Sequence, residues 1–253
     1  MVSVTKRVND FKQPRGGYLP IKEFETIQLE DNLTLSEDEN INPGLIGLCV
    51  DYLSRYLLVG NIHESFRIPY TASHLINEDK HALSLINQIK GLDDQSIIAA
   101  CQLCGYDVLL RAGNKSAFVP AESIQPNQNV INNIKVMVNR TLDVFKNYFK
   151  DIVLDGFTFK GGYSSIISSG DGDYLTQEYL IDLKVSKQNM TPKQTLQVLV
   201  YYLMGLRSEH QNYFKQLKFL SLYNPRKNVI YKYDLTKLDK NTKLEVETEV
   251  IGY

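Results

Sequence analysis

The chain of 253 residues has little cysteine and no long apolar run. Its three cysteines are too few for a disulfide framework, and they fall one short of the four thiolates of an iron–sulfur cluster or an all-cysteine zinc site. No segment approaches the roughly 20 apolar residues of a membrane helix, and the N-terminal residues lack the apolar centre of a signal peptide. We therefore expect reduced, buried thiols in a cytoplasmic protein with no membrane partner.

Net charge is also nearly absent, with a formal value of -1, which as an average argues against nucleic-acid binding. The charges are unevenly distributed, however. Residues 184–240 carry 11 Lys and Arg against 3 acidic residues, a balance of +8, whereas residues 22–39 carry 7 acidic residues against one lysine. The basic block predicts a face that attracts phosphates, with a solvated lysine-rich surface as the alternative.

Three stretches of the chain differ in composition and in the spacing of their apolar residues. Residues 1–42 are polar and lack a sustained apolar period, which predicts an extended or partly ordered arm. Residues 43–150 predict a mostly helical N-terminal lobe, and residues 151–253 predict a core containing a sheet. A single continuous domain over 43–253 is the alternative division.

Local patterns place the elements within these stretches. Apolar residues at helical spacing predict helices over 44–59, 81–89, 94–112 and 129–149. Short runs rich in β-branched and aromatic residues predict strands over 152–159, 163–168, 173–175, 179–185, 217–222 and 229–233. A threonine cap, a proline and a glutamine at 191–194 predict the start of a helix that runs to about Arg207.

One predicted strand, 179–185, carries two charged residues. Side chains alternate along a strand, so Asp182 and Lys184 share one face. Burying such charges is costly without a partner or a metal. Asp173 opens the preceding strand, and a short hairpin can bring it beside Asp182. Paired carboxylates suit a hard cation such as Mg²⁺ or Mn²⁺, with the backbone carbonyl of Leu183 as a further ligand.

Each of these residues can perform a different part of phosphodiester hydrolysis. Asp173 and Asp182 would hold the metal, which acts as a Lewis acid and lowers the pKa of its bound water. Lys184 would position or deprotonate the attacking water and stabilise charge on the phosphoryl oxygens. Gln194, Gln197 and Tyr201 share one face of the following helix, at spacings of three and seven residues, and that face can point at the site.

The succession of Gly170-Asp171-Gly172-Asp173, then Asp182-Leu183-Lys184, then Gln197-x-x-x-Tyr201 resembles the PD-(D/E)XK nuclease superfamily, in particular its RecB-like branch. The resemblance implies an α/β restriction-endonuclease-like core, a mixed sheet flanked by helices. It also implies that the first acid and Asp182 bind metal, that Lys184 is catalytic, and that Gln197 and Tyr201 lie near the site and contact substrate. Asp173 is the preferred first acid because hydrophobic residues follow it directly, and Asp171 is the alternative.

The chain departs from this family in two ways. It lacks the cysteine cluster of some RecB-like members, and it lacks a helicase-type nucleotide-binding loop, since no G-x-x-x-x-G-K-[ST] occurs. Members often place one more acidic or histidine ligand on a helix before the sheet. Asp51, Glu64 and His63 are candidates here, and their spacing does not distinguish them.

The sequence thus predicts a Mg²⁺- or Mn²⁺-dependent nuclease that acts on DNA rather than RNA, in phage, mobile-element or defence biology by analogy. Lys187 and Gln194 join Gln197 and Tyr201 as predicted substrate-binding residues, and the dense tyrosines of 201–233 could stack on bases or cover the sheet. A homo-oligomer or a protein partner stays open. The alternatives are an inactive protein of this fold that binds nucleic acid or protein, and a structural Asp182–Lys184 ion pair.

Overall fold

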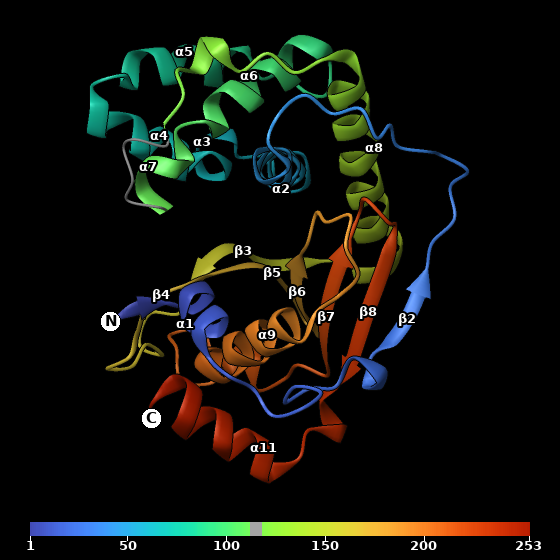
Figure 1. Cartoon of the computed structure of the whole chain (residues 1–253), viewed down its shortest axis with the longest axis vertical. Coiled ribbons are helices and arrows are strands. Elements are labelled where there is room, and N and C mark those ends of the chain that lie inside the picture. Colours follow the sequence, from blue (N-terminus) through green and yellow to red (C-terminus); the bar gives the residue numbers. More distant parts are fainter. Residues whose placement is uncertain (112–117) are drawn as a thin grey trace. The chain divides into compact units, whose positions relative to one another are not determined.

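The computed structural model describes residues 1–111 and 118–253, which form two compact units. Residues 1–30 and 145–253 make up the first, here called the sheet unit, and residues 31–144 make up the second, the helical unit. Figure 1 shows both, and each is described by itself below. The predicted boundaries at 42 and 150 thus move to 30 and 144.

The sheet unit is built on a mixed six-stranded sheet (Figure 1). Its strand order is β2-β8-β7-β6-β5-β3. The strands are β2 (Glu25–Gln28), β3 (Ile152–Thr158), β5 (Asp171–Thr176), β6 (Tyr179–Leu183), β7 (Phe219–Asn224) and β8 (Val229–Asp234). Pair β6–β7 is parallel and is connected by helix α9 (Pro192–Gly205), whereas the neighbouring pairs β5–β6 and β7–β8 are antiparallel. The fold is therefore α/β with a mixed sheet flanked by helices.

Shorter elements complete the sheet unit. Strands β1 (Val2–Ser3) and β4 (Ile167–Ser169) form a separate parallel pair. The helical elements are α1 (Val4–Asp10), η1 (Ile21–Glu23), η5 (Phe145–Phe149), α10 (Gln211–Phe214), η6 (Leu235–Lys237), α11 (Lys240–Glu245) and η7 (Val246–Ile251).

Both faces of the central strands are covered, and β6 and β7 are buried almost throughout. On one face, Leu175 and Leu180 pack in a common core with Leu196 and Val200 of α9. On the opposite face, the ring of Tyr174 lies 4.7 Å from that of Phe145, centroid to centroid. Alternation along β5 and β6 therefore places Asp173 and Asp182 on the face that α9 covers.

Helix α9 begins where the sequence predicted. The side chain of Gln194 accepts a hydrogen bond of 2.9 Å from the backbone N–H of Thr191, and Pro192 occupies the first helical turn. Most of the predicted strands lie within about two residues of the observed ones. The local patterns were thus sufficient for the centre of the sheet unit.

The N-terminal residues differ from the extended or partly ordered arm that the sequence predicted. Ser3 caps α1, whose Val4 and Val8 are buried, and β2 forms an antiparallel pair with β8. Leu19 and Phe24 also belong to the core that packs on α9. These elements are short, and they are stabilised by contacts with distant segments rather than by a local apolar period.

The predicted strand over 163–168 is another difference. Strand β4 begins only at Ile167, because the hydroxyl of Ser164 accepts hydrogen bonds from the backbone N–H groups of Ile166 and Ile167. The same hydroxyl donates to the backbone oxygen of Ile251. Such side-chain bonds offer the backbone an alternative to a strand ladder.

The helical unit consists of helices and connecting segments throughout its described part. These helices are α2 (Pro43–Val59), α3 (Ile62–Ser65), α4 (Arg67–Ser73), η2 (His74–Ile76), α5 (Asp79–Gln88), α6 (Asp94–Cys104), α7 (Asp107–Arg111), η4 (Ala121–Ser123) and α8 (Gln128–Val144). Asp51 and Arg55, four residues apart on α2, form an ion pair of 3.0 Å. Cys49, Cys101 and Cys104 are free and buried, as predicted.

Two predicted helices of this unit have different limits. The helix predicted over 94–112 is interrupted at Gly105, where a Cβ atom would lie 2.5 Å from Ile124, and it continues as α7. Ala112, its last predicted residue, lies outside the described residues. The helix predicted over 129–149 changes at residue 145 from α8 to the π-helical turn η5. Across the described parts of both units, no helix is long and apolar enough to cross a membrane.

Candidate metal centre

Asp173 lies on β5, and its carboxylate is next to the end of β6. The ladder pairs Tyr174 with Ile181 and Leu175 with Leu180, and continuing it by one step sets Asp173 opposite Asp182. Residues directly opposite in an antiparallel pair point to the same face, with Cβ atoms about 5 Å apart. Asp173 Oδ2 also accepts a hydrogen bond of 2.8 Å from the backbone N–H of Leu183. The two aspartates therefore lie on adjacent strands of one face.

Asp182 occupies the most enclosed position of the group, with 2% of its surface exposed. Its other neighbour in the sheet is Leu222 of β7. Lys184 Nζ lies 2.7 Å from Asp182 Oδ2, and the Lys184 backbone N–H continues the ladder by donating to Tyr223 O at 2.8 Å. A buried carboxylate needs such compensation, and a cation held between two carboxylates would supply more of it.

Tyr201 of α9 lies over this part of the sheet. Its hydroxyl accepts a 3.0 Å hydrogen bond from the side-chain amide of Gln197, and its ring stacks on Phe159 with centroids 5.0 Å apart. Burial raises the pKa of Tyr201 well above its usual value, and the negative charges of Asp182 and Asp173 raise it further. The hydroxyl therefore keeps its proton and can donate a hydrogen bond toward the carboxylates or a bound anion.

Asp171 is the alternative first acid. It begins β5 two residues before Asp173, so the two side chains share a face, and it is half-buried. Its charge contributes to the raised pKa of Tyr201 after those of Asp182 and Asp173. The ladder sets Asp173, and not Asp171, opposite Asp182, which supports the preference for Asp173 as the first acid.

Sequence reasoning missed the contribution of α1. The Gln197 amide donates to Thr5 Oγ1 at 3.3 Å, so α1 contacts the predicted site residues of α9. A Cβ atom at Gly170, just before β5, would lie 2.7 Å from Val4 and 3.3 Å from Tyr201, so glycine is needed where the chain approaches both. The spacing of Val4 and Val8 was the available signal, but two apolar residues are too few to predict a helix.

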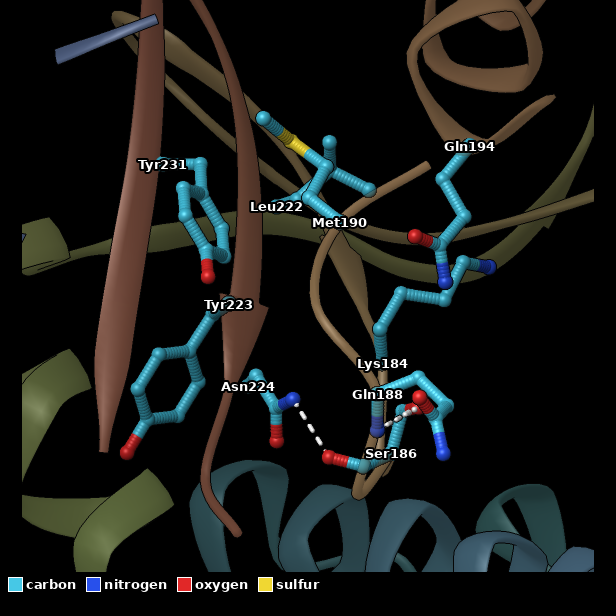
Figure 2. Close-up of a pocket in the computed structure, with 9 residues that line it drawn as sticks. All are labelled: Lys184, Ser186, Gln188, Met190, Gln194, Leu222, Tyr223, Asn224 and Tyr231. Carbon is cyan, nitrogen blue, oxygen red and sulfur yellow. Dashed lines mark hydrogen bonds between the residues drawn. The ribbon is translucent and has the colours of Figure 1, made fainter. Parts of the chain in front are cut away.

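The other predicted substrate-binding residues lie at the start of α9 and before it. Gln194 has one amide atom committed to the cap of α9. Its side chain also lines a pocket with Lys184 (Figure 2). Lys187 is exposed in the loop between β6 and α9.

The candidates for a further ligand, Asp51 and Glu64, belong to the helical unit. Asp51 pairs with Arg55, and Glu64 lies 3.4 Å from Arg67 on the surface of that unit. His63 is in the same short helix as Glu64. These three residues stay candidates.

The possible metal ligands at this centre are oxygen atoms, which favour a hard cation. Among the described residues, no group of three or more His, Cys, Asp and Glu side chains is arranged to hold a metal ion. A cation at Asp173 and Asp182 would therefore use two carboxylates together with the Leu183 carbonyl and water. Mg²⁺ commonly binds through one or two carboxylates and keeps several waters, so the donor set fits it.

Comparisons with protein-family models, with curated proteins and with solved structures found no match. The mixed six-stranded sheet flanked by helices is compatible with the predicted α/β core. The likeness to the PD-(D/E)XK superfamily thus rests on the residues of the sequence and on where they lie in this sheet.

Proposed function

We propose that this chain is a metal-dependent nuclease with a restriction-endonuclease-like core. The observation that carries the proposal is the convergence on one sheet face of Asp173 and Asp182, on adjacent strands, with Lys184 at 2.7 Å from Asp182. Tyr201 and Gln197 cover the same face from α9. Two acids can bind a metal ion, and a lysine and a neutral hydroxyl can stabilise charge on a phosphate, which are contributions that catalyse phosphodiester hydrolysis.

Each residue has a distinct role in this proposal. Asp173 and Asp182 would bind Mg²⁺ or Mn²⁺, which when bound polarises the phosphoryl oxygen and makes its water more acidic. The Lys184 ammonium, fixed by its ion pair with Asp182, would orient the attacking water and stabilise negative charge developing on the phosphate. Tyr201 would donate its retained proton in a hydrogen bond to the phosphate, with Gln197 holding the hydroxyl in place.

The proposed substrate is nucleic acid, with DNA preferred over RNA. The support is the basic block of residues 184–240, which begins at Lys184 itself and includes the loop after β6 and the β7–β8 turn. A cytoplasmic role in phage, mobile-element or defence biology is part of the proposal by analogy alone.

The second candidate is a non-catalytic protein of this fold that binds nucleic acid or a protein partner. The observation favouring it is the close Asp182–Lys184 ion pair, which would also stabilise an inactive sheet. The two candidates differ in one measurable respect, since only the nuclease depends on Lys184 for strand cleavage.

The decisive experiment compares wild type with Lys184→Ala on supercoiled, linear and single-stranded DNA and on RNA, with Mg²⁺, with Mn²⁺ and with neither. We expect metal-dependent cleavage by wild type and a loss of about 10²-fold or more in the variant, as for removal of one group that stabilises transition-state charge. Lys135→Ala is the matched control, because Lys135 also pairs with a carboxylate, Asp94, but in the helical unit and outside the basic block.

Folding must be monitored in the same experiment. Lys184→Ala leaves Asp182 buried without its ion pair, which lowers stability, so thermal unfolding is recorded for each protein. Asp173→Asn is a second variant that keeps the shape of the side chain and should also lose cleavage. Equal cleavage by wild type and both variants on every substrate would overturn the proposal.

A further inference from the structure

The N-terminal segment, residues 1–17, lies against the start of α9 within the sheet unit. Gln13 donates from its side-chain amide to the backbone oxygen of Pro192 at 3.0 Å, and Lys193 Nζ donates to Asn9 O at 3.1 Å. Figure 1 shows α1 beside α9 in the same way. The N-terminal segment, which carries no predicted site residue, therefore adjoins the first turn of α9.

The first turn of α9 also adjoins the candidate metal centre. Gln194 of this turn lines the same small pocket as Lys184 (Figure 2). Gln197, one turn further along α9, donates to Tyr201 at 3.0 Å and to Thr5 of α1 at 3.3 Å. A phosphate at the candidate metal centre would thus have both the start of α9 and the N-terminal segment beside it.

Positive charge is concentrated where these segments meet. Residues 1–17 and 184–194 together carry seven lysines and arginines against one aspartate, a balance of +6. The aspartate, Asp10, pairs with Lys6 at 2.7 Å. Three further basic side chains of these segments are exposed and form what we call the α9 basic patch: Lys12, Arg15 and Lys193.

The loop between α1 and η1, which carries two cations of the patch, is fixed by its own hydrogen bonds. The Gly17 N–H donates to Pro14 O at 2.9 Å. The backbone therefore holds these cations beside Lys193, where like charges repel each other and an anion bound among them offsets the repulsion. The start of α9 favours an anion as well, because the backbone dipoles of a helix leave a partial positive charge at its N-terminus.

The dimensions of α9 suit a phosphate backbone. The length of α9 from Tyr201, over the candidate metal centre, to Lys193 is about 12 Å, at about 1.5 Å per residue. Successive phosphates of one DNA strand are roughly 3.4 Å apart along the duplex axis, so this length corresponds to roughly three to four phosphates. A strand that enters the metal centre can thus reach the patch within a few nucleotides.

The opposite end of α9 has cations without this concentration of charge. Arg207 lies 3.8 Å from Glu247, and Lys160 O accepts a hydrogen bond of 2.8 Å from the Glu209 N–H. Lys160 and Lys215 are exposed there, and so is Glu209. The backbone dipoles leave a partial negative charge at this end of the helix. An anion is therefore favoured at the start of α9 rather than at its end.

We propose that the α9 basic patch binds the phosphate backbone of the nucleic-acid strand whose phosphodiester lies at Asp173 and Asp182. The N-terminal segment is then part of the substrate-binding surface, although it lies outside the basic block of residues 184–240. The inference rests on the proposed function in naming nucleic acid as the substrate. Contacts to phosphates carry no sequence information, so the patch raises affinity equally for unrelated sequences.

The test is a binding experiment in which Ca²⁺ replaces Mg²⁺, so that affinity is measured without depending on cleavage. Fluorescence anisotropy gives Kd over a range of salt concentrations on two DNA duplexes of equal length and unrelated sequence. The variant combines Lys12→Gln with Arg15→Gln. The matched control combines Lys160→Gln with Lys215→Gln, which removes the same charge from the opposite end of α9. Thermal unfolding confirms that each protein is folded.

We expect the patch variant to raise Kd about tenfold or more on both duplexes. It should also reduce the slope of log Kd against log salt by about 2, since each lost phosphate contact removes about 0.9. The control should stay within about twofold of wild type with an unchanged slope, because salt screens charges that are distant from the bound strand.

Four results would overturn the inference: equal weakening by the variant and the control, an unchanged salt slope in the variant, weakening on one sequence alone, or no binding of either duplex by wild type. Absence of cleavage in Mg²⁺, with the effect of the patch variant on Kd intact, would instead count against the proposed function alone.

Discussion

Gly172 separates the two aspartates at the start of β5 and has no room for a side chain. It pairs with Phe157 of β3, and a Cβ atom at Gly172 would lie 2.3 Å from the end of the Phe157 ring. Real Cβ contacts are never so close, and Phe157 is itself packed against Phe159 and Phe214. The backbone that carries Asp173 therefore depends on a glycine at this position.

Gly172→Ala should destabilise the sheet unit by about 1–3 kcal/mol, since overpacking forces a shift of β5 or of the Phe157 ring. Urea unfolding measures the change. Gly91→Ala is the control, because nothing lies within 4 Å of a Cβ atom there. A Gly172 variant as stable as the Gly91 variant would show that β5 and Phe157 separate easily.

At the scale of residues, the charged pair on β6 was predictable and its surroundings were less so. Strand alternation is a local rule, and it sufficed to place Asp182 and Lys184 on one face, where they form an ion pair. The contact of Gln197 with Thr5 joins residues 192 positions apart, and no local pattern encodes it.

At the scale of elements, a bidentate ion pair between Asp31 and Arg140 holds the segment before α2 against α8. Arg140 donates from Nε to Asp31 Oδ2 at 2.5 Å and from a terminal nitrogen to Asp31 Oδ1 at 2.8 Å. It also donates to Leu33 O at 2.8 Å. The hydrogen bonds from Arg140 to the carboxylate are the largest cause that lowers the pKa of Asp31, and a hydrogen bond from the Leu33 backbone N–H to the same carboxylate lowers it further.

Asp31→Asn should lower the free energy of unfolding at neutral pH by roughly 1–3 kcal/mol, as for loss of hydrogen bonds to a charged group. Because the folded state depresses the pKa of Asp31, this stabilisation is present above the pKa of unfolded Asp and is lost as the pH falls through the folded value. Urea unfolding at pH 7 and near pH 3 measures the difference between wild type and variant.

The control is Asp10→Asn in the exposed pair with Lys6, which should have little effect at either pH. A difference between wild type and Asp31→Asn that persists unchanged at pH 3 would show that the Asp31 charge is not the cause.

The elements that the sequence predicted and those it missed differ in how they are stabilised. Strands β5 and β6 and helix α9 carry their own turn, alternation and capping signals, and these agree with the fold. Helix α1 has 7 residues and strand β2 has 4, and both exist because distant segments pack against them. Short elements of this kind have too few residues to show a period.

At the scale of the whole molecule, tyrosine burial predicts an alkaline limit of stability. Burial is the first cause that raises the pKa of Tyr18, Tyr179, Tyr233 and Tyr253, each to about 12. Unfolded tyrosines ionise near pH 10. Between these values the unfolded chain binds fewer protons than the folded one, so stability falls as the pH rises.

We therefore expect the free energy of unfolding to be constant with respect to these groups below about pH 10 and to decrease above it. Urea unfolding from pH 8 to 11.5, with tyrosinate absorbance recorded in parallel, measures this. Tyr18→Phe should reduce the slope, because Tyr18 donates to Glu245 and loses that bond on ionisation. Complete tyrosine ionisation near pH 10 in a protein that stays folded would contradict the prediction.

The sheet unit is divided along the chain, with the whole helical unit between its two parts. Residues 1–30 leave the ribosome long before their partners, since Gln28 of β2 pairs with Val229 of β8, 201 residues later in the chain. At cellular rates of translation this delay is on the order of ten seconds. Throughout it, Val4, Val8, Leu19 and Phe24 have no β7, β8 or α9 to cover them. The apolar residues of 1–30 therefore stay uncovered until the rest of the sheet unit is synthesised, whereas residues 31–144 are all synthesised before β3 appears.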